Sequence, residues 1–168
     1  MVPSNASTNK HRGYIIPIGG AEEKLHNTAI LERFLEICGG KQARIAIIPT
    51  ASELDDTGRN YEKLFRKLGI RHARVLGIET REDCSDEQHL DYIRKSDGVF
   101  MTGGNQLRLS TTLGGTPVAQ QIRRGNAAGM HVAGTSAGAA FMPEHMIAGG
   151  SEGRRQAPTR SRWRRAWA

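Results

Sequence analysis

The chain has 168 residues, of which 38% are hydrophobic and 24% are charged. This composition suits one globular domain with a buried core, and it excludes collagen-like, disulfide-stapled and low-complexity proteins. No apolar run approaches the roughly 18 residues of a membrane span. Residues 1–12 form a polar leader without the apolar stretch of a secretory signal. Cys38 and Cys84 lack metal-ligand spacing, so we interpret them as buried free thiols in a reducing cytoplasm.

The net charge of +7 is unevenly distributed. Residues 154–168 hold six arginines, both tryptophans and no acidic residue. The rest of the chain therefore has 18 of the 24 basic residues and all 17 acidic ones. A strongly basic protein often binds nucleic acid. Here the body is close to neutral, so the basicity belongs to a tail of different composition.

Strands and helices are predicted to alternate along the chain. Short apolar runs predict five buried strands, at 13–18, 43–48, 74–78, 98–101 and 130–133. Apolar residues at helical spacing follow them, as in Leu31, Phe34, Leu35 and Cys38. We expect Ser85 to cap one helix, Thr116 to begin another and Gly125 to end it.

This alternation predicts an α/β fold with an open, mostly parallel sheet and helices on both faces. Ligands in such folds bind at the carboxyl ends of the strands. The loops after four of the predicted strands should meet at that rim: 19–24, 49–52, 103–106 and 134–138. Three of the four are glycine-rich or built of small residues.

Gly134-Thr135-Ser136-Ala137-Gly138 lies between a predicted strand and a predicted helix. In that context Gly-x-Ser-x-Gly is typical of a nucleophile elbow, whose glycines permit the sharp turn that exposes the serine hydroxyl. The N–H of Ala137 would face the same point, and a second oxyanion donor could come from Gly103 or Gly104 if the two strands are neighbours. The bland alternative is that the small residues only permit tight packing of the helix on the sheet.

A serine nucleophile needs a base, and the local sequence supplies no clear one. His131 lies about 16 Å before Ser136 along a strand. His145 lies about 13 Å beyond it along any continuous helix. His26 is the remaining histidine on the predicted rim, where a solvated side chain at a helix start is the simpler interpretation.

Four motifs resemble the cyanophycinase family of serine exopeptidases, which is related to dipeptidase E and similar in fold to class I glutamine amidotransferases. They occur in the family's order over about residues 13–153: Gly19-Gly20-Ala21-Glu22-Glu23-Lys24, Thr102-Gly103-Gly104-Asn105-Gln106-Leu107, Gly134 to Ala140, and Met146-Ile147. The resemblance implies hydrolysis of cyanophycin, an arginine-grafted polyaspartate, to β-aspartyl-arginine. It also implies a homodimer and no cofactor or metal.

Carried over by motif, the resemblance makes Ser136 the nucleophile, with Ala137 and Gly104 lining the oxyanion hole and Glu152 orienting the base. The residues it implies in substrate binding are Gln106, Asn105, Gly103, Lys24 and Glu23. Four carboxylates lie on or near the rim loops and could pair with guanidinium groups: Glu22, Glu23, Asp55 and Asp56. For any single one of them, a solvated loop charge is the simpler interpretation.

The resemblance stops at Arg154, where the tail begins. Family members carry their catalytic histidine in a later Asp-Gln-His motif, which this sequence lacks. We therefore expect the α/β domain of residues 13–153 to be incomplete at its C-terminal side. We interpret residues 154–168 as an out-of-frame or truncated end, and a chain without the base would lose most of the rate.

Two alternatives remain open at the level of sequence. The chain could be a related dipeptidase or amidase with another acyl substrate. It could also be a non-catalytic binder whose arginine- and tryptophan-rich tail contacts nucleic acid. The near-neutral body, which has no nucleic-acid-binding motif, disfavours the second alternative.

Overall fold

A computed structural model describes residues 11–19, 28–143, 145–147 and 163–165 of the chain. Its centre is a five-stranded sheet in the order β1-β5-β4-β2-β3, and every neighbouring pair is parallel. The strands are β1 (Ile15–Ile18), β2 (Arg44–Ile48), β3 (His72–Val75), β4 (Gly98–Met101) and β5 (His131–Thr135). The predicted parallel α/β fold is confirmed.

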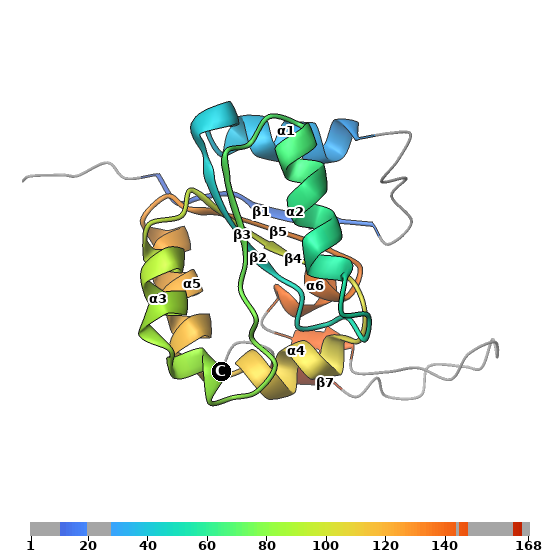
Figure 1. Ribbon diagram of the computed structural model, residues 1–168. Coiled ribbons are helices and arrows are strands. Elements are labelled where there is room, and N and C mark those ends of the chain that lie inside the picture. The colour runs from blue at the N-terminus through green and yellow to red at the C-terminus, as the bar shows by residue number, and fades with distance from the viewer. Residues whose placement is uncertain (1–10, 20–27, 144, 148–162, 166–168) are drawn as a thin grey trace, which may run out of the picture.

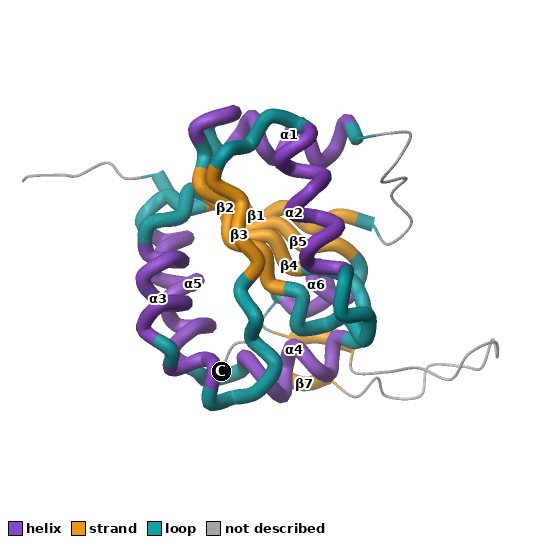
Figure 2. The backbone as a smooth tube through the Cα atoms, viewed as in Figure 1, coloured by secondary structure: helices purple, strands orange, loops and turns teal. Residues whose placement is uncertain are grey.

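Helices cover both faces of this sheet, as Figures 1 and 2 show. Helices α1 and α2 pack on one face, and α3, α4, α5 and α6 contribute to the core on the other. Their bounds are α1 (Ala29–Ile37), α2 (Thr57–Lys67), α3 (Glu87–Arg94), α4 (Gln106–Leu113), α5 (Pro117–Ala127) and α6 (Ala137–Phe141). Two 3₁₀ turns, η1 (Gly40–Gln42) and η2 (Asp83–Ser85), join elements.

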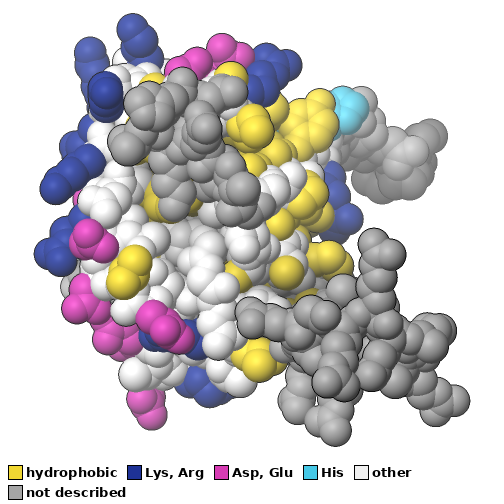
Figure 3. Space-filling view, turned by 90° about the vertical axis from the view of Figure 1, so that its right-hand side faces the viewer, with side chains coloured by type: hydrophobic (Ala, Val, Ile, Leu, Met, Phe, Trp, Pro, Cys, Tyr) yellow, Lys and Arg dark blue, Asp and Glu magenta, His cyan; other side chains and the backbone are white. Residues whose placement is uncertain are grey.

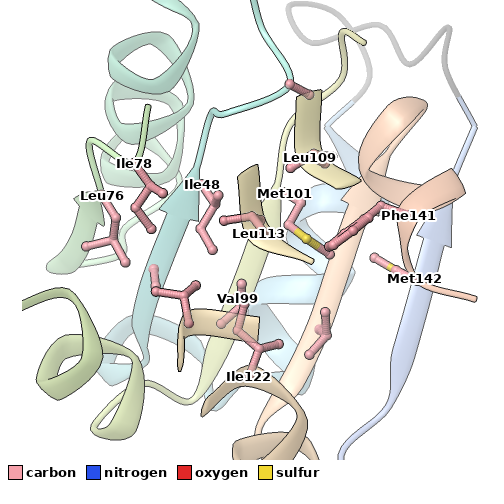
Figure 4. Close-up of a cluster of buried hydrophobic side chains, with 14 of the residues drawn as sticks. Ile48, Leu76, Ile78, Val99, Met101, Leu109, Leu113, Ile122, Phe141 and Met142 are labelled. Atoms are coloured by element: carbon pink, nitrogen blue, oxygen red, sulfur yellow. The ribbon is translucent and has the colours of Figure 1, made fainter. Parts of the chain in front are cut away.

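Continuous apolar runs in the central strands supply two cores at once, because successive side chains point to opposite faces. Ile45 and Ile47 of β2 face α1 and α2, whereas Ala46 and Ile48 face the other layer. Phe100 of β4 meets the aromatic rings of the first layer: Phe34, Tyr61 and Phe65. Figure 4 shows the second core, which includes Met101, Leu109 and Phe141.

Strand β1 differs from the buried strand that its sequence predicts. It lies at an edge of the five-stranded sheet, paired with β5 alone among the described residues. Tyr14 just before it is 64% exposed and Ile15 is 53% exposed. Figure 3 shows hydrophobic side chains gathered on one half of the face in view, with most charged side chains on the other half.

Several helix and strand boundaries also differ from the predictions. Asp86, not Ser85, caps α3, because its side chain accepts a hydrogen bond from the Gln88 N–H. Helix α5 begins after Thr116 as expected but continues past Gly125, whose missing Cβ makes room for Met130. Strand β3 ends at Val75, three residues earlier than predicted.

Outside the main sheet, β6 (His145–Ile147) pairs antiparallel with β7 (Trp163–Arg165). The ladder places part of the arginine-rich tail beside the segment that follows α6. Within the described parts of the chain, no helix combines the length and hydropathy needed to cross a membrane.

Candidate active site

Three adjacent strands end at the same rim of the sheet. Strand β4 lies between β2 and β5, with Met101 level with both Ile48 and Gly134. The loop after β4 is therefore next to the loop after β5, which is the neighbourhood that a shared oxyanion hole requires. The predicted meeting of residues 49–52, 103–106 and 134–138 at one rim is confirmed. Residues 20–24 of the fourth predicted loop, 19–24, lie outside the described residues.

Ser136 has an unusual backbone conformation. Its φ is 51° and its ψ is −110°, and it is the one non-glycine residue with positive φ in the described part of the chain. Such a conformation costs about 1–3 kcal/mol and is typical of functional sites. Ser136 is also exposed, although Thr135 before it and Ala137 after it are buried. The turn thus lifts one hydroxyl out of a buried segment.

The two glycines of the elbow are required by packing. A Cβ on Gly134 would lie 2.6 Å from the carbonyl carbon of Gly138. A Cβ on Gly138 would overlap the carbonyl oxygen of Met101 and lie 3.0 Å from that residue's Cβ. Helix α6 therefore starts directly against β4 and β5. The small residues permit this close packing, and the packing fixes the strained serine, whose role as the nucleophile stays a prediction.

The loop after β4 approaches Ser136 closely. A Cβ on Gly103 would lie 3.3 Å from the Ser136 Cβ. Gly104 has a φ of 141°, and a Cβ there would overlap the Ala51 carbonyl oxygen. The Asn105 N–H donates to that same oxygen at 2.8 Å. Gly104 is therefore confined to glycine by both its conformation and its neighbour.

Two of the predicted site residues also serve the local fold. Asn105 caps α4, because its Oδ1 accepts from the Leu107 N–H at 2.9 Å. Ala137 is the first residue of α6, so no earlier helical turn offers its N–H a carbonyl partner. Gly104 and Ala137 thus stand on the two loops that meet at Ser136, and their role as oxyanion donors remains a prediction.

A hollow of about 470 Å³ opens beside this turn. Its described lining comes from the loop after β2, the start of α2 and the loop after β4: Ser52, Glu53, Leu54, Thr57, Gly103, Gly104 and Asn105. Gln106, predicted to bind substrate, is half-buried at the start of α4 and is not part of that lining.

We identify no base for Ser136 among the described residues. His131 lies at the amino end of β5, five residues before the serine, and its Nδ1 accepts a hydrogen bond from the Tyr14 N–H at 3.0 Å. In the described part of the chain, no side chain hydrogen bonds to the Ser136 hydroxyl. The predicted site residues Glu23, Lys24 and Glu152, and the candidate base His26, lie outside the described residues.

The cysteines do not compete with Ser136 as nucleophiles. Cys38 and Cys84 are free and buried, as predicted. Burial, with a smaller effect of Asp97, raises the pKa of Cys38 to about 12. Burial also raises the pKa of Cys84. Both thiols therefore stay protonated near neutral pH. The described residues contain no group of three or more His, Cys, Asp or Glu that could hold a metal ion.

The sequence did not single out two features of this rim. Helix α4 was missed because Ser110, Thr111 and Thr112 are weak helix formers and obscure the apolar pair Leu109 and Leu113. Glu53 was passed over in favour of Asp55 and Asp56. The nearby Pro49 and the repeated small residues signal a loop there, but not which of its carboxylates faces the hollow.

The fold and the turn at Ser136 define an open α/β protein whose Gly-x-Ser-x-Gly segment has the strand–turn–helix geometry of a nucleophile elbow. The sequence profile of peptidase family S51 matches residues 15–162, and the chain belongs to that family. It is 43% identical over 152 residues to a cyanophycinase of Geminocystis herdmanii, and 44% identical over 149 residues to one of Trichormus variabilis. These alignments cover 89% and 88% of the chain.

A solved structure gives the same result for the fold. The crystal structure of a peptidase from an acI-B1 actinobacterium matches with a TM-score of 0.68 and 28% identity, over 81% of this chain and 59% of that one. The chain spans about half the length of the curated relatives, 55% of the Geminocystis protein and 49% of the Trichormus protein.

Proposed function

We propose that this chain carries the nucleophile half of a cyanophycin-degrading serine peptidase, in which Ser136 attacks the backbone of the arginine-grafted polyaspartate. The observation that carries the proposal is the positive φ of an exposed Ser136 between buried neighbours. The cyanophycinases that align over nearly nine-tenths of the chain support this choice of substrate. By the same resemblance, the protein would act in the cytoplasm as a homodimer.

In the proposed reaction, the Ser136 Oγ adds to a backbone carbonyl carbon of the polymer while a base removes the hydroxyl proton. The carbonyl oxygen becomes an oxyanion, which the N–H groups of Ala137 and Gly104 would stabilise. Collapse of this intermediate breaks the C–N bond, and the leaving amine takes up the proton. Water then hydrolyses the acyl-enzyme and releases the second product.

No described residue is identified as the base of this reaction. His26 is one candidate, and a histidine contributed by a separate segment is another. Without a base, an oxyanion hole and substrate binding alone retain about 10³–10⁴-fold catalysis over water. The family membership of the chain and the rate of this particular chain are therefore separate questions.

The test is release of β-aspartyl-arginine from insoluble cyanophycin by the purified chain, compared with Ser136→Ala and His26→Gln. Loss of release in Ser136→Ala supports the proposal. Loss of release in the separate variant His26→Gln identifies His26 as the base. A β-aspartyl dipeptide panel distinguishes the alternative dipeptidase activity. Release that is equal in the wild type and Ser136→Ala would contradict a serine mechanism, provided that circular dichroism shows both chains folded.

A further inference from the structure

The hollow lined by the loops after β2 and β4 has one charged residue in its described lining. Glu53 supplies a carboxylate, Ser52 and Thr57 supply hydroxyls, and Asn105 supplies an amide. Leu54 adds apolar surface and is 69% exposed. A carboxylate next to exposed apolar surface fits a ligand that has a cationic head on an apolar stem.

Hydrogen bonds hold this lining in one arrangement. Ser52 Oγ lies 2.7 Å from Thr57 Oγ1 and accepts from the Leu54 N–H at 3.0 Å. Arg108 Nη1 on α4 donates to the Ser52 carbonyl oxygen at 2.9 Å. The loop after β2 is therefore fastened to α2 and to α4, and Glu53 lies between two fixed neighbours. A hollow built this way loses little conformational entropy when it binds.

We propose that this hollow is the binding site for a guanidinium-bearing side chain of the substrate, with Glu53 as the residue that selects it. The loop Gly103–Asn105 lines the hollow, and Gly103 also borders Ser136, so the hollow is next to the proposed nucleophile. The assignment of the ligand to the substrate rests on the proposed function. The volume of about 470 Å³ is within the range of small-molecule sites.

The chemistry of the lining favours guanidinium over a primary ammonium. A guanidinium pairs with a carboxylate through two parallel hydrogen bonds and is weakly hydrated, so it also packs on apolar surface such as Leu54. An ammonium is a strongly hydrated point charge that gains less from an open, half-apolar site.

Neighbouring carboxylates are less suitable. Asp56 precedes α2, and its Oδ2 accepts from Asn60 Nδ2 at 3.1 Å. Asp55 and Asp56 are exposed and do not belong to the lining of the hollow. The structure therefore moves the expected guanidinium partner from these two aspartates to Glu53.

Binding can be measured without turnover in the Ser136→Ala chain, by titration calorimetry with β-aspartyl-arginine, β-aspartyl-lysine and β-aspartyl-citrulline. Citrulline has nearly the shape of arginine but no charge. We expect arginine to bind about three- to tenfold more tightly than citrulline, which is modest because the carboxylate is exposed. Lysine should fall between them.

Glu53→Gln should abolish this preference, whereas Asp55→Asn, which removes a carboxylate two residues further on, should retain it. Equal binding of arginine and citrulline by the parent, no binding of either, or loss of preference in Asp55→Asn alone would overturn the inference. An arginine preference without Ser136-dependent hydrolysis would sustain the hollow and contradict the proposed function. Ser136-dependent hydrolysis that is unchanged in Glu53→Gln, together with equal binding of the arginine and citrulline dipeptides, would support the proposed function and overturn the inference.

Discussion

The two ends of the parallel sheet use polar groups in opposite ways. At the amino ends of the strands, a hollow of about 350 Å³ is lined by Arg94, Asp97 and His131 among others. Asp97 joins two strands there, because its carboxylate accepts from the Arg44 N–H at 2.8 Å and its carbonyl oxygen accepts from the His131 N–H at 2.9 Å. At the carboxyl ends, by contrast, Ser136 is strained and exposed.

At the amino end of the sheet, a hollow with charged residues therefore does not indicate a ligand site, because Asp97 already bonds to the neighbouring strands. Polar groups that bond to one another across strands stabilise the sheet and have little capacity left for a ligand. A strained residue persists only where its surroundings hold it in place, as the packing around Gly134 and Gly138 does for Ser136. The two ends should accordingly respond differently to substitution.

The largest expected effect lies in the packing that fixes the strained turn. Gly138→Ala would place a methyl group against the Met101 backbone, which cannot rotate away as a side chain could. We expect the free energy of unfolding to fall by about 3 kcal/mol or more, the upper end for overpacking. Urea denaturation followed by circular dichroism measures the change.

Gly77→Ala is the matched control, because a Cβ at Gly77 would meet nothing within 4 Å. It should change the stability by less than about 0.5 kcal/mol. Similar stabilities for Gly138→Ala and Gly77→Ala would show that α6 can move off β4, and the elbow would then not be held by packing.

A second, smaller effect separates the strain from the hydroxyl of Ser136. Ser136→Ala and Ser136→Gly both remove the nucleophile, but only glycine relieves the positive φ of 51°. We expect Ser136→Gly to be more stable than Ser136→Ala by about 1 kcal/mol, although glycine ordinarily destabilises. Thermal unfolding of the two variants, both without hydrolytic activity, is the measurement. A more stable alanine variant would mean that the turn stores no strain.

A feature of this molecule is predictable from the sequence when adjacent residues determine it, and much less so when it depends on contacts between distant segments. Thr116 before Pro117 and the buried run Arg44–Ile48 specify a helix start and a strand by local rules, and both are where they were expected. The elbow at Ser136 was predicted because its glycines and its place between strand and helix are also local. The strained backbone angles could not be read from residue types.

Features that depend on contacts between distant segments were beyond the sequence. The apolar run at Ile15–Ile18 does not state how many neighbours the strand has, so its edge position was missed. Gly125 looks like a helix stop, but it is a contact for Met130, and the left-handed turn falls at Gly129 with a φ of 113°. The position of Glu53 over the hollow likewise depends on hydrogen bonds that Ser52 makes with distant residues.

The smallest expected effect concerns the amino end of the sheet, where His131 should make stability depend on pH. Its Nδ1 accepts from the Tyr14 N–H, and its ring stacks on Tyr14 with 5.4 Å between centroids. Burial lowers the pKa of His131 below its ordinary value of 6.5, and nearby Asp97 partly opposes this. The unfolded chain therefore binds this proton at a higher pH than the folded one.

The contribution of His131 to stability is consequently complete above about pH 6.5 and declines as the pH falls through the lowered pKa. His131→Asn keeps an acceptor near the Nδ1 position but cannot titrate. Between about pH 7.5 and about pH 5.5, the melting temperature of the wild type should fall by about 1–3 °C more than that of the variant. The lowered pKa values of Asp83 and Asp91 act below this window and affect both chains alike.

Equal pH slopes would show that the bond to Tyr14 is replaced by water at no cost. The edge strand would then be held by its backbone ladder with β5 and by the hydrogen bonds of Gly13 to Asn126 and of Gly19 to Thr135. The contrast between a bonded amino end and a strained carboxyl end would rest on Asp97.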